Sequence, residues 1–174
     1  LFETENEAPT VMSVQDTYRI VATKTVSDEE LNSLSKSICE KYSISPVTVK
    51  WSSIPIRSKL IISRTPFLSN YICLSPESFA FTGFDIDNIK SHIKHHIQHL
   101  IEIESNNNFL HTESHEEITD WFDGFHKKHF YSCSCGFVKG TINRRKNVTR
   151  KFLRKPICCG SNYQFEENTE YDWD

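Results

Sequence analysis

The decamer Ser91–Leu100 constrains this chain more than any other segment, because it combines an apolar helical stripe with a cluster of histidines. Its sequence is SHIKHHIQHL, and it holds half of the eight histidines of the chain. Isoleucines recur every three or four residues, which predicts an amphipathic helix from about Asp85 to the Asn106–Asn108 run. On a helical wheel three histidines fall on the flank of this stripe, where a partly buried pocket would lie: His92, His95 and His99.

His95 and His99 have the H-x-x-x-H spacing of a helical zinc site, because side chains at positions i and i+4 share one face. In metallopeptidases with this spacing, the residue after the first histidine is a glutamate that acts as general base for a zinc-bound water. His96 occupies that general-base position here. Two alternatives stay open: the register of His92 and His96 is sterically as good, and the histidines could be polar edge residues without a metal.

Length and composition predict one domain with a small appendage. The chain has 174 residues, of which 37% are hydrophobic, so a core can form. No apolar stretch approaches the length of a membrane span, and the first residues, LFETENEAPT, lack the features of a signal peptide. We therefore expect an intracellular protein without a membrane partner. Because the sequence begins with Leu, it could be a piece of a longer protein.

Charge is distributed unevenly along the chain. Residues 125–156 carry ten Lys or Arg and no Asp or Glu, whereas residues 157–174 carry five acidic residues and no basic one. The basic block predicts a polyanionic partner, and the alternative is a solvated face held by the acidic tail. Tyr131, Phe137 and Phe152 could stack on bases or serve in packing. The residues expected to contact phosphates are Lys139, Arg144, Arg145, Lys146, Arg150, Lys151, Arg154 and Lys155.

The six cysteines fall into two kinds. Cys39 and Cys73 stand singly in apolar segments and are expected to be buried thiols. The other four surround the basic block, where a metal site is favoured over disulfides because no secretory signal is present. Reduced free thiols, or a three-cysteine site completed by His129, are the alternatives. The four are Cys133, Cys135, Cys158 and Cys159.

Local patterns predict an α+β fold with a small three-stranded sheet. The capping box Ser27–Glu30 predicts a helix that runs to about Lys41. Strands are expected at Val47–Trp51, Lys59–Ser63 and Tyr71–Leu74. Asp16–Thr23 could be a short strand or an approach to the first helix. A Glu- and His-rich loop or short helix is expected between the second long helix and Asp120.

Several motifs, taken in the order in which they occur along the chain, resemble those of the SprT-like (Spartan-type) zinc metalloprotease family over roughly residues 28–162. Val49–Ser52 (VKWS) with the following Arg57 is similar to the V-x-W-S strand of the family, and Tyr71–Ser75 (YICLS) to its I-x-L-S strand. Ile93–Leu100 (IKHHIQHL) lies on its L-x-H-E-x-x-H helix. The later motifs are Asp123–Phe130 (D-x-x-H-G-x-x-F in the family), Tyr131–Gly136, Arg144–Arg150 and Cys158–Gly160.

The resemblance implies a zincin-like domain with an active-site helix, followed by a zinc-ribbon-like module. It implies a Zn²⁺ ion held by His95, His99 and His126 with an open fourth position, and a second, structural Zn²⁺ held by the four clustered cysteines. The expected divisions are a disordered acidic leader at 1–12, the SprT-like domain at 13–130, the basic zinc-ribbon-like module at 131–162 and an acidic tail at 163–174. The chain departs from the family at His96, at Lys127 in place of glycine, and at the adjacent Cys158 and Cys159 in place of C-x-x-C.

Because His96 replaces the catalytic glutamate, we expect a pseudoenzyme, with no catalytic residue assigned. The expected role is binding of nucleic acid, DNA rather than RNA, or of a larger protein complex in the nucleus, in the context of DNA repair. One alternative is an active DNA-dependent zinc metalloprotease that cleaves DNA-bound or DNA-crosslinked proteins. A further alternative is a purely structural subunit without metal.

Overall fold

The computed structural model describes residues 14–52, 59–61, 71–105, 107–121, 124–144 and 148–154. The expected leader at 1–12 and the acidic tail at 163–174 lie outside these residues. So do five of the expected site residues: Arg145, Lys146, Lys155, Cys158 and Cys159. None of the helices within the described ranges has the length and hydropathy needed to cross a membrane.

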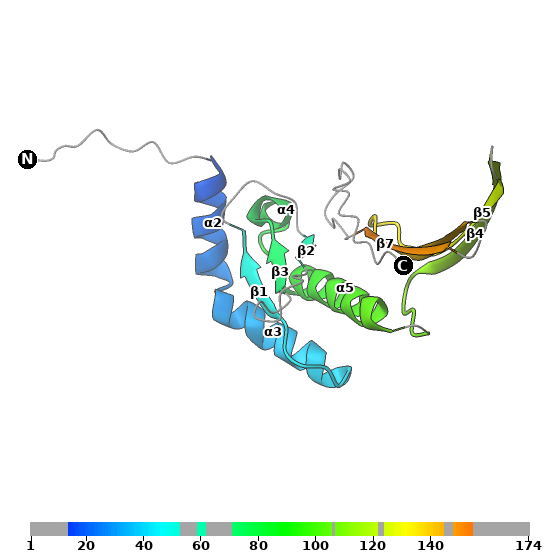
Figure 1. Ribbon diagram of the computed structural model, residues 1–174. Coiled ribbons are helices and arrows are strands. Elements are labelled where there is room, and N and C mark those ends of the chain that lie inside the picture. Colours follow the sequence, from blue (N-terminus) through cyan, green and yellow to red (C-terminus); the bar gives the residue numbers. More distant parts are fainter. Residues whose placement is uncertain are drawn as a thin grey trace, which may run out of the picture.

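The first part of the chain forms helices around a three-stranded sheet (Figure 1). Two helices, α2 (Val14–Thr25) and α3 (Asp28–Lys41), precede the strands. The strands are β1 (Thr48–Trp51), β2 (Lys59–Ile61) and β3 (Tyr71–Leu74), in the order β1-β3-β2. The central strand β3 runs parallel to β1 and antiparallel to β2. A short helix, α4 (Pro76–Ala80), and the long α5 (Ile86–Glu104) follow.

The second part is a four-stranded antiparallel sheet, which follows α5 along the chain (Figure 1). Its strands are β4 (Glu113–Trp121), β5 (Gly124–Ser132), β6 (Val138–Arg144) and β7 (Val148–Arg154), paired in chain order. Together with the first part, this arrangement confirms the α+β class.

The local signals explain why α3 and β1 lie together. The Ser27 hydroxyl accepts a hydrogen bond from the Glu30 backbone N–H at 3.2 Å, and the Glu30 carboxylate accepts one from the Ser27 backbone, so the capping box is confirmed. The Asn32 side chain then pairs with both backbone groups of Val49 at 2.9 Å each. This amide therefore fixes the helix against the strand.

The core lies between α5, α3 and the three-stranded sheet. The isoleucine stripe of α5 is fully buried at Ile89, Ile93 and Ile97. Trp51 contacts the rings of Phe79 and Phe84 edge-on, each with ring centroids 5.8 Å apart. Burial of this stripe orients α5, because it sets which helix face remains for polar side chains.

The structure settles two of the expected elements. Asp16–Thr23 is helical and lies within α2, which buries Ala22 in the core. The expectation of a loop or short helix up to Asp120 is wrong, because Glu113–Trp121 forms β4 and pairs with β5 over its full length. Pairing with β5, the next strand along the chain, stabilises this strand, and its charged sequence gives little local signal for it.

Candidate metal centre

Helix α5 presents two histidines on one face. Because His95 and His99 stand one turn apart, their Nε2 atoms lie 3.1 Å from each other. The His99 ring is fully buried, and the His95 ring is partly buried. The orientation of this face follows from the buried isoleucines on the other side of the helix.

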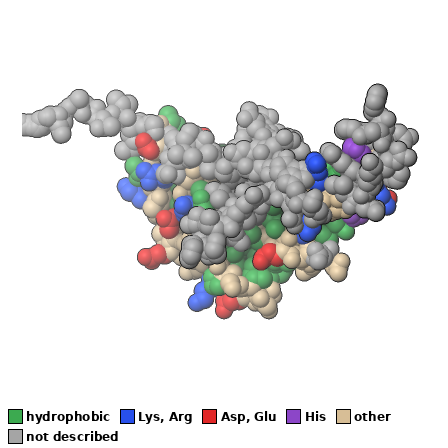
Figure 2. Space-filling model, viewed as in Figure 1, with side chains coloured by type: hydrophobic (Ala, Val, Ile, Leu, Met, Phe, Trp, Pro, Cys, Tyr) green, Lys and Arg blue, Asp and Glu red, His purple; other side chains and the backbone are tan. Residues whose placement is uncertain are grey.

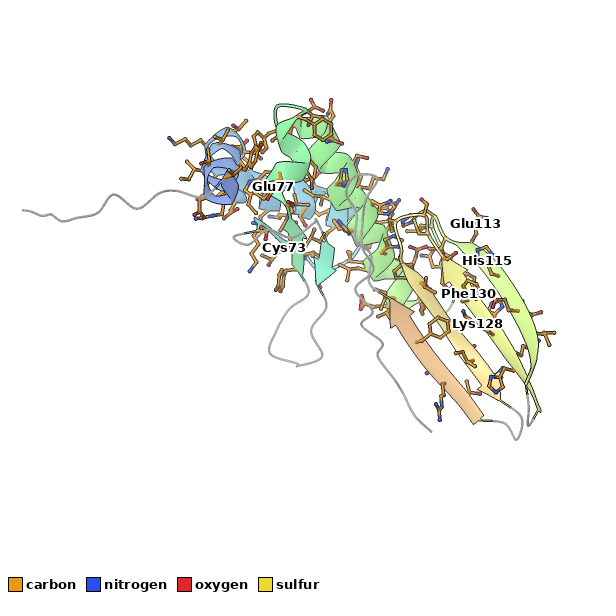
Figure 3. The ribbon with its side chains drawn as sticks, turned by 90° about the horizontal axis from the view of Figure 1, so that it is seen from above. Cys73, Glu77, Glu113, His115, Lys128 and Phe130 are labelled. Atoms are coloured by element: carbon orange, nitrogen blue, oxygen red, sulfur yellow. The ribbon has the colours of Figure 1, made fainter. Side chains whose placement is uncertain are left out.

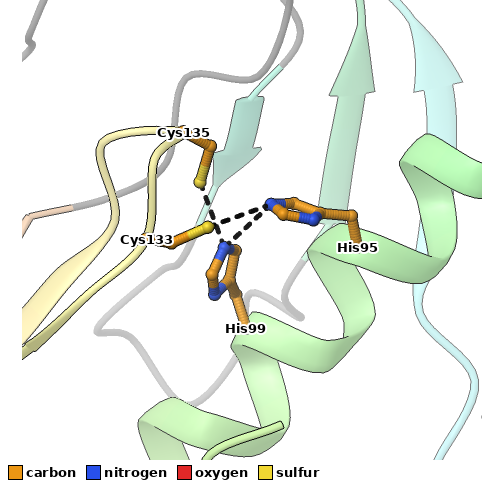
Figure 4. Close-up of side chains that lie close together, drawn as sticks. All are labelled: His95, His99, Cys133 and Cys135. Atoms are coloured by element: carbon orange, nitrogen blue, oxygen red, sulfur yellow. Dashed lines mark hydrogen bonds between the residues drawn. The ribbon is translucent and has the colours of Figure 1, made fainter. Parts of the chain in front are cut away.

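Two cysteines reach this face from the tight turn between β5 and β6. The Cys133 N–H donates to the Phe137 carbonyl at 2.9 Å, and the Gly136 N–H donates to the Cys133 carbonyl at 3.0 Å. Gly136 has φ of 100°, a backbone conformation that a side chain would strain. The turn places Cys135 Sγ 3.1 Å from His99 Nε2 and Cys133 Sγ 3.7 Å from His95 Nε2 (Figure 4).

The four side chains fit a tetrahedral metal ion. Their ligand atoms all lie within 4.8 Å of one another. Zinc bonds of about 2.0–2.1 Å to nitrogen and about 2.3 Å to sulfur, at tetrahedral angles, separate ligand atoms by roughly 3.3–3.8 Å. The separations given above, 3.1 to 3.7 Å, are close to that range. Two imidazoles and two thiols are a donor set that suits zinc among the common metals.

A buried carboxylate supports the histidines from behind. His99 Nδ1 donates to Glu102 Oε1 at 2.7 Å, and both side chains are fully buried. The Thr112 hydroxyl donates to the other Glu102 oxygen at 2.9 Å. Burial raises the pKa of Glu102, but the hydrogen bonds from His99 and Thr112 hold it below its ordinary value. The ionised carboxylate fixes the His99 proton on Nδ1 and turns the Nε2 lone pair toward the cysteines.

His111, in the segment between α5 and β4, also faces the centre. Its Nε2 lies 3.0 Å from His99 Nε2, and its Nδ1 lies 3.3 Å from Glu102 Oε1. His99, Glu102 and His111 form a second group whose ligand atoms are close enough to hold a metal.

The surroundings of the Cys133 thiol shift its pKa. The Cys135 thiol and burial raise the pKa of Cys133, whereas the rings of His111, His95 and His99 lower it, and the lowering prevails. A lowered pKa favours the thiolate, which is the form of cysteine that binds metals. The buried ring of Phe137 stacks on His99 with centroids 4.2 Å apart and forms an apolar wall of the centre.

Lys139 of β6 joins the second sheet to the end of α5. Its ammonium donates to the backbone carbonyls of Glu102, Ile103 and Ser105, at 2.7, 2.8 and 2.5 Å. These carbonyls lie at the C-terminal end of the helix, where a positive charge is favourable. Burial lowers the pKa of Lys139, the Glu102 charge opposes this shift, and Lys151 adds to it.

The structure groups the expected metal ligands differently from the resemblance. His95 and His99 lie together, but Cys133 and Cys135 join them instead of forming a site apart. His126 lies on β5 opposite Thr119, seven residues before Cys133, and belongs to neither metal group found among the described residues. At about 3.3 Å per residue, it is roughly 20 Å away along the strand.

Two residues of the centre were not assigned to a metal site from the sequence, in which Glu102 was only one of several candidates for a displaced base. Glu102 has a usable signal, because it follows His99 by three positions on the predicted helix and therefore lies on the same face. His111 has no such signal, since the approach of its ring depends on the path of the chain between α5 and β4. His111 is therefore identified only by the folded arrangement.

His96, at the general-base position of metallopeptidases, points away from the donor group. It is fully buried, and no described residue hydrogen-bonds either ring nitrogen. Burial, followed by the charges of His95 and the other nearby histidines, lowers the pKa of His96 well below its ordinary value. The ring is therefore neutral in the fold. His92 packs edge-on against Phe79, with ring centroids 4.9 Å apart.

The basic residues occupy different surroundings on the second sheet. Paired positions share a face, so Lys128, Ile142 and Arg150 lie on one side, and Lys127 and Lys139 lie on the other. Lysine, arginine and histidine side chains come to the surface in the part of Figure 2 that corresponds to this sheet. Arg144 and Arg154 end β6 and β7, and Lys151 is an exposed residue of β7.

Comparison with known proteins leaves the family open. No protein-family model matches the chain, and no curated protein and no solved structure is significantly similar to it.

Proposed function

We propose that this chain is a catalytically inactive SprT-like domain that binds one Zn²⁺ ion and serves as a nucleic-acid-binding module. The observation that carries the proposal is the convergence of His95, His99, Cys133 and Cys135 on one position. Four protein ligands fill a tetrahedral zinc ion and leave no place for a water, as in structural rather than catalytic zinc sites. The ion links α5 to the turn of the second sheet and thereby couples the two parts of the fold.

The surroundings of the centre support the absence of proteolysis. A zinc peptidase needs a group that takes a proton from the metal-bound water. His96 is buried away from the donors, and the Glu102 carboxylate already accepts hydrogen bonds from His99 and Thr112. Neither residue is placed to act as the base.

One face of the second sheet supports nucleic-acid binding. The Lys128 ammonium lies over the rings of Phe130 and Phe152, at 4.6 and 5.5 Å from their centroids. His115 stacks on Phe130 with centroids 5.0 Å apart, and Figure 3 shows His115, Phe130 and Lys128 together on this sheet. We call Lys128, Phe130, Arg150 and Phe152 the aromatic-basic face.

Gly140 keeps this face flat between its two phenylalanines, to which it is paired. A Cβ atom at Gly140 would lie 2.6 Å from the Phe130 Cβ, so only glycine fits there. Aromatic rings beside cations are the combination that stacks on bases and neutralises phosphates. DNA as the preferred partner, a role in DNA repair and a location in the nucleus are parts of the same proposal.

A salt titration of oligonucleotide binding tests this function with a matched pair of variants. Lys127 and Lys128 are neighbours on opposite faces of β5, and Lys127 pairs with Glu116 at 3.1 Å. We expect Lys128→Met to weaken DNA binding and to reduce the salt slope by about one, as loss of one phosphate contact does. Lys127→Met should leave both quantities unchanged. Equal effects of the two variants, or binding that does not respond to salt, would contradict the proposed face.

A further inference from the structure

The metal centre contains one donor more than a tetrahedral ion needs. The His111 Nε2 atom lies 3.0 Å from His99 Nε2, as close as the 3.1 Å between the two helical histidines. Cys135 Sγ lies 3.1 Å from His99 Nε2, and Cys133 Sγ lies 3.7 Å from His95 Nε2. Two further imidazoles and two thiols therefore lie around the ring of His99.

Glu102 accepts a hydrogen bond from the His111 backbone and lies close to the His111 ring, but only the His99 ring hydrogen-bonds this carboxylate. Its Oε1 atom lies 2.7 Å from His99 Nδ1 and 3.3 Å from His111 Nδ1, and its Oε2 accepts the His111 backbone N–H at 3.3 Å. Metal-binding histidines characteristically direct their second nitrogen to such a carboxylate. Since His111 comes from the segment before β4, its placement does not depend on the cysteine-bearing turn.

We propose that His111 gives this centre a second, oxidised state. When a peroxide joins Cys133 and Cys135 in a disulfide, His95, His99 and His111 retain the metal ion, and its fourth position opens to water. The inference rests on the metal centre proposed above and adds a redox response to it. Three histidines and a water are a ligand set that zinc adopts in proteins.

The reaction with hydrogen peroxide is balanced within the centre. The Cys133 thiolate attacks one peroxide oxygen, the O–O bond breaks, and a sulfenic acid and a hydroxide form. The Cys135 thiolate then attacks the sulfenic sulfur, the S–S bond forms, and a second hydroxide leaves. The two sulfurs lose two electrons, the peroxide gains them, and two protons from solvent convert the hydroxides to two waters.

The structure favours oxidation of the thiols over disruption of the histidines. Cys133 and Cys135 are two residues apart in one turn, and both are partly exposed. His99 and Glu102 are fully buried, so the histidine part of the centre is protected. The disulfide removes both thiolate ligands together and leaves the three imidazoles, of which His99 is held by its hydrogen bond to Glu102.

The test compares metal retention by reduced and peroxide-treated protein, loaded with Zn²⁺ alone. We expect the reduced wild type and the reduced His111→Ala variant to bind about one ion each, since both keep two imidazoles and two thiolates. After oxidation, the wild type should retain its ion with lower affinity. Oxidised His111→Ala should bind at least about 100-fold more weakly than the oxidised wild type, because only two ligands remain.

A second arm removes the thiolates without an oxidant. Cys133→Ser/Cys135→Ser should still bind the ion, and addition of His111→Ala should abolish binding. His115→Ala, on the exposed part of β4, is the matched control and should behave as its parent in both arms.

Three results would overturn the inference while leaving the reduced centre standing. They are complete release of the ion from the oxidised wild type, equal retention by both oxidised proteins, and failure of reduced His111→Ala to bind. If the reduced wild type binds no zinc, the proposed metal centre itself fails.

Discussion

The Glu102 carboxylate lies 2.7 Å from the Nδ1 atom of His99, one helical turn earlier, and both side chains are fully buried. A buried ionised carboxylate is costly unless its oxygens are satisfied, and here His99 and Thr112 satisfy them. The contact orients Nε2 of His99, the nitrogen proposed to bind the metal, toward Cys135. Histidines that were only polar residues at the edge of the helix would not require a buried carboxylate hydrogen-bonded to the ring.

Replacement of Glu102 by glutamine should weaken zinc binding by about 10- to 100-fold, because the carboxylate sets the tautomer and orientation of His99. The matched control is Glu104→Gln, since Glu104 is an exposed residue at the end of the same helix. Competition with a chromogenic chelator measures both affinities. A similar loss in the two variants would show that charge on the helix, and not the contact with His99, is responsible.

His92 should make the fold less stable in mild acid. Burial, and then the charge of His95, lowers the pKa of His92 in the folded state below the ordinary 6.5. The unfolded chain therefore binds an extra proton as the pH falls below about 6.5, and stability decreases until the folded-state pKa is passed.

Chemical unfolding between pH 7 and pH 5 checks this prediction. His92→Phe should reduce the slope of unfolding free energy against pH by up to about 1.4 kcal/mol per pH unit. The wild type, measured under the same conditions, is the comparison. An unchanged slope in His92→Phe would refute the prediction.

Lys139 should contribute to stability rather than to nucleic-acid binding. Lys139→Met leaves three carbonyls at the end of α5 without their ammonium donor, which should cost about 1–3 kcal/mol of unfolding free energy. The salt slope of DNA binding should stay unchanged, in contrast to Lys128→Met. If Lys139→Met instead lowered the salt slope of DNA binding without loss of stability, Lys139 would be a phosphate contact.

The wild type should not cleave casein or histones, with or without DNA. The reason is that a closed centre has no position for the attacking water and no nearby base. A chelator arm identifies metal-dependent cleavage. If DNA stimulated proteolysis and a chelator stopped it, the protein would be an active protease and not only a binding module.

The sequence allowed prediction of the elements that local chemistry determines. The capping box, the isoleucine stripe and the strands at Thr48–Trp51 and Tyr71–Leu74 all have signals within a few residues, and the structure has them. Cys39 and Cys73 are buried thiols, as expected from their apolar segments. Strand β4 escaped prediction because its charged residues pair only with β5.

The grouping of the metal ligands depends on contacts between distant parts of the chain. His95 and His99 are paired by helical spacing, but Cys133 and Cys135 reach them only because the turn between β5 and β6 lies against α5. The family resemblance suggested His126 for this role, and the length of β5 separates His126 from the turn. Spacing along the chain gives that distance only once residues 124–132 are known to form one continuous strand.

The X-ray absorption spectrum of the zinc-loaded protein counts the sulfur and nitrogen ligands around the ion and so identifies which side chains hold it. We expect two sulfurs and two imidazole nitrogens in the wild type and in His126→Ala, and one sulfur fewer in Cys135→Ser. A site with three imidazoles and no sulfur, or one with four sulfurs, would contradict a metal centre shared by helix α5 and the second sheet.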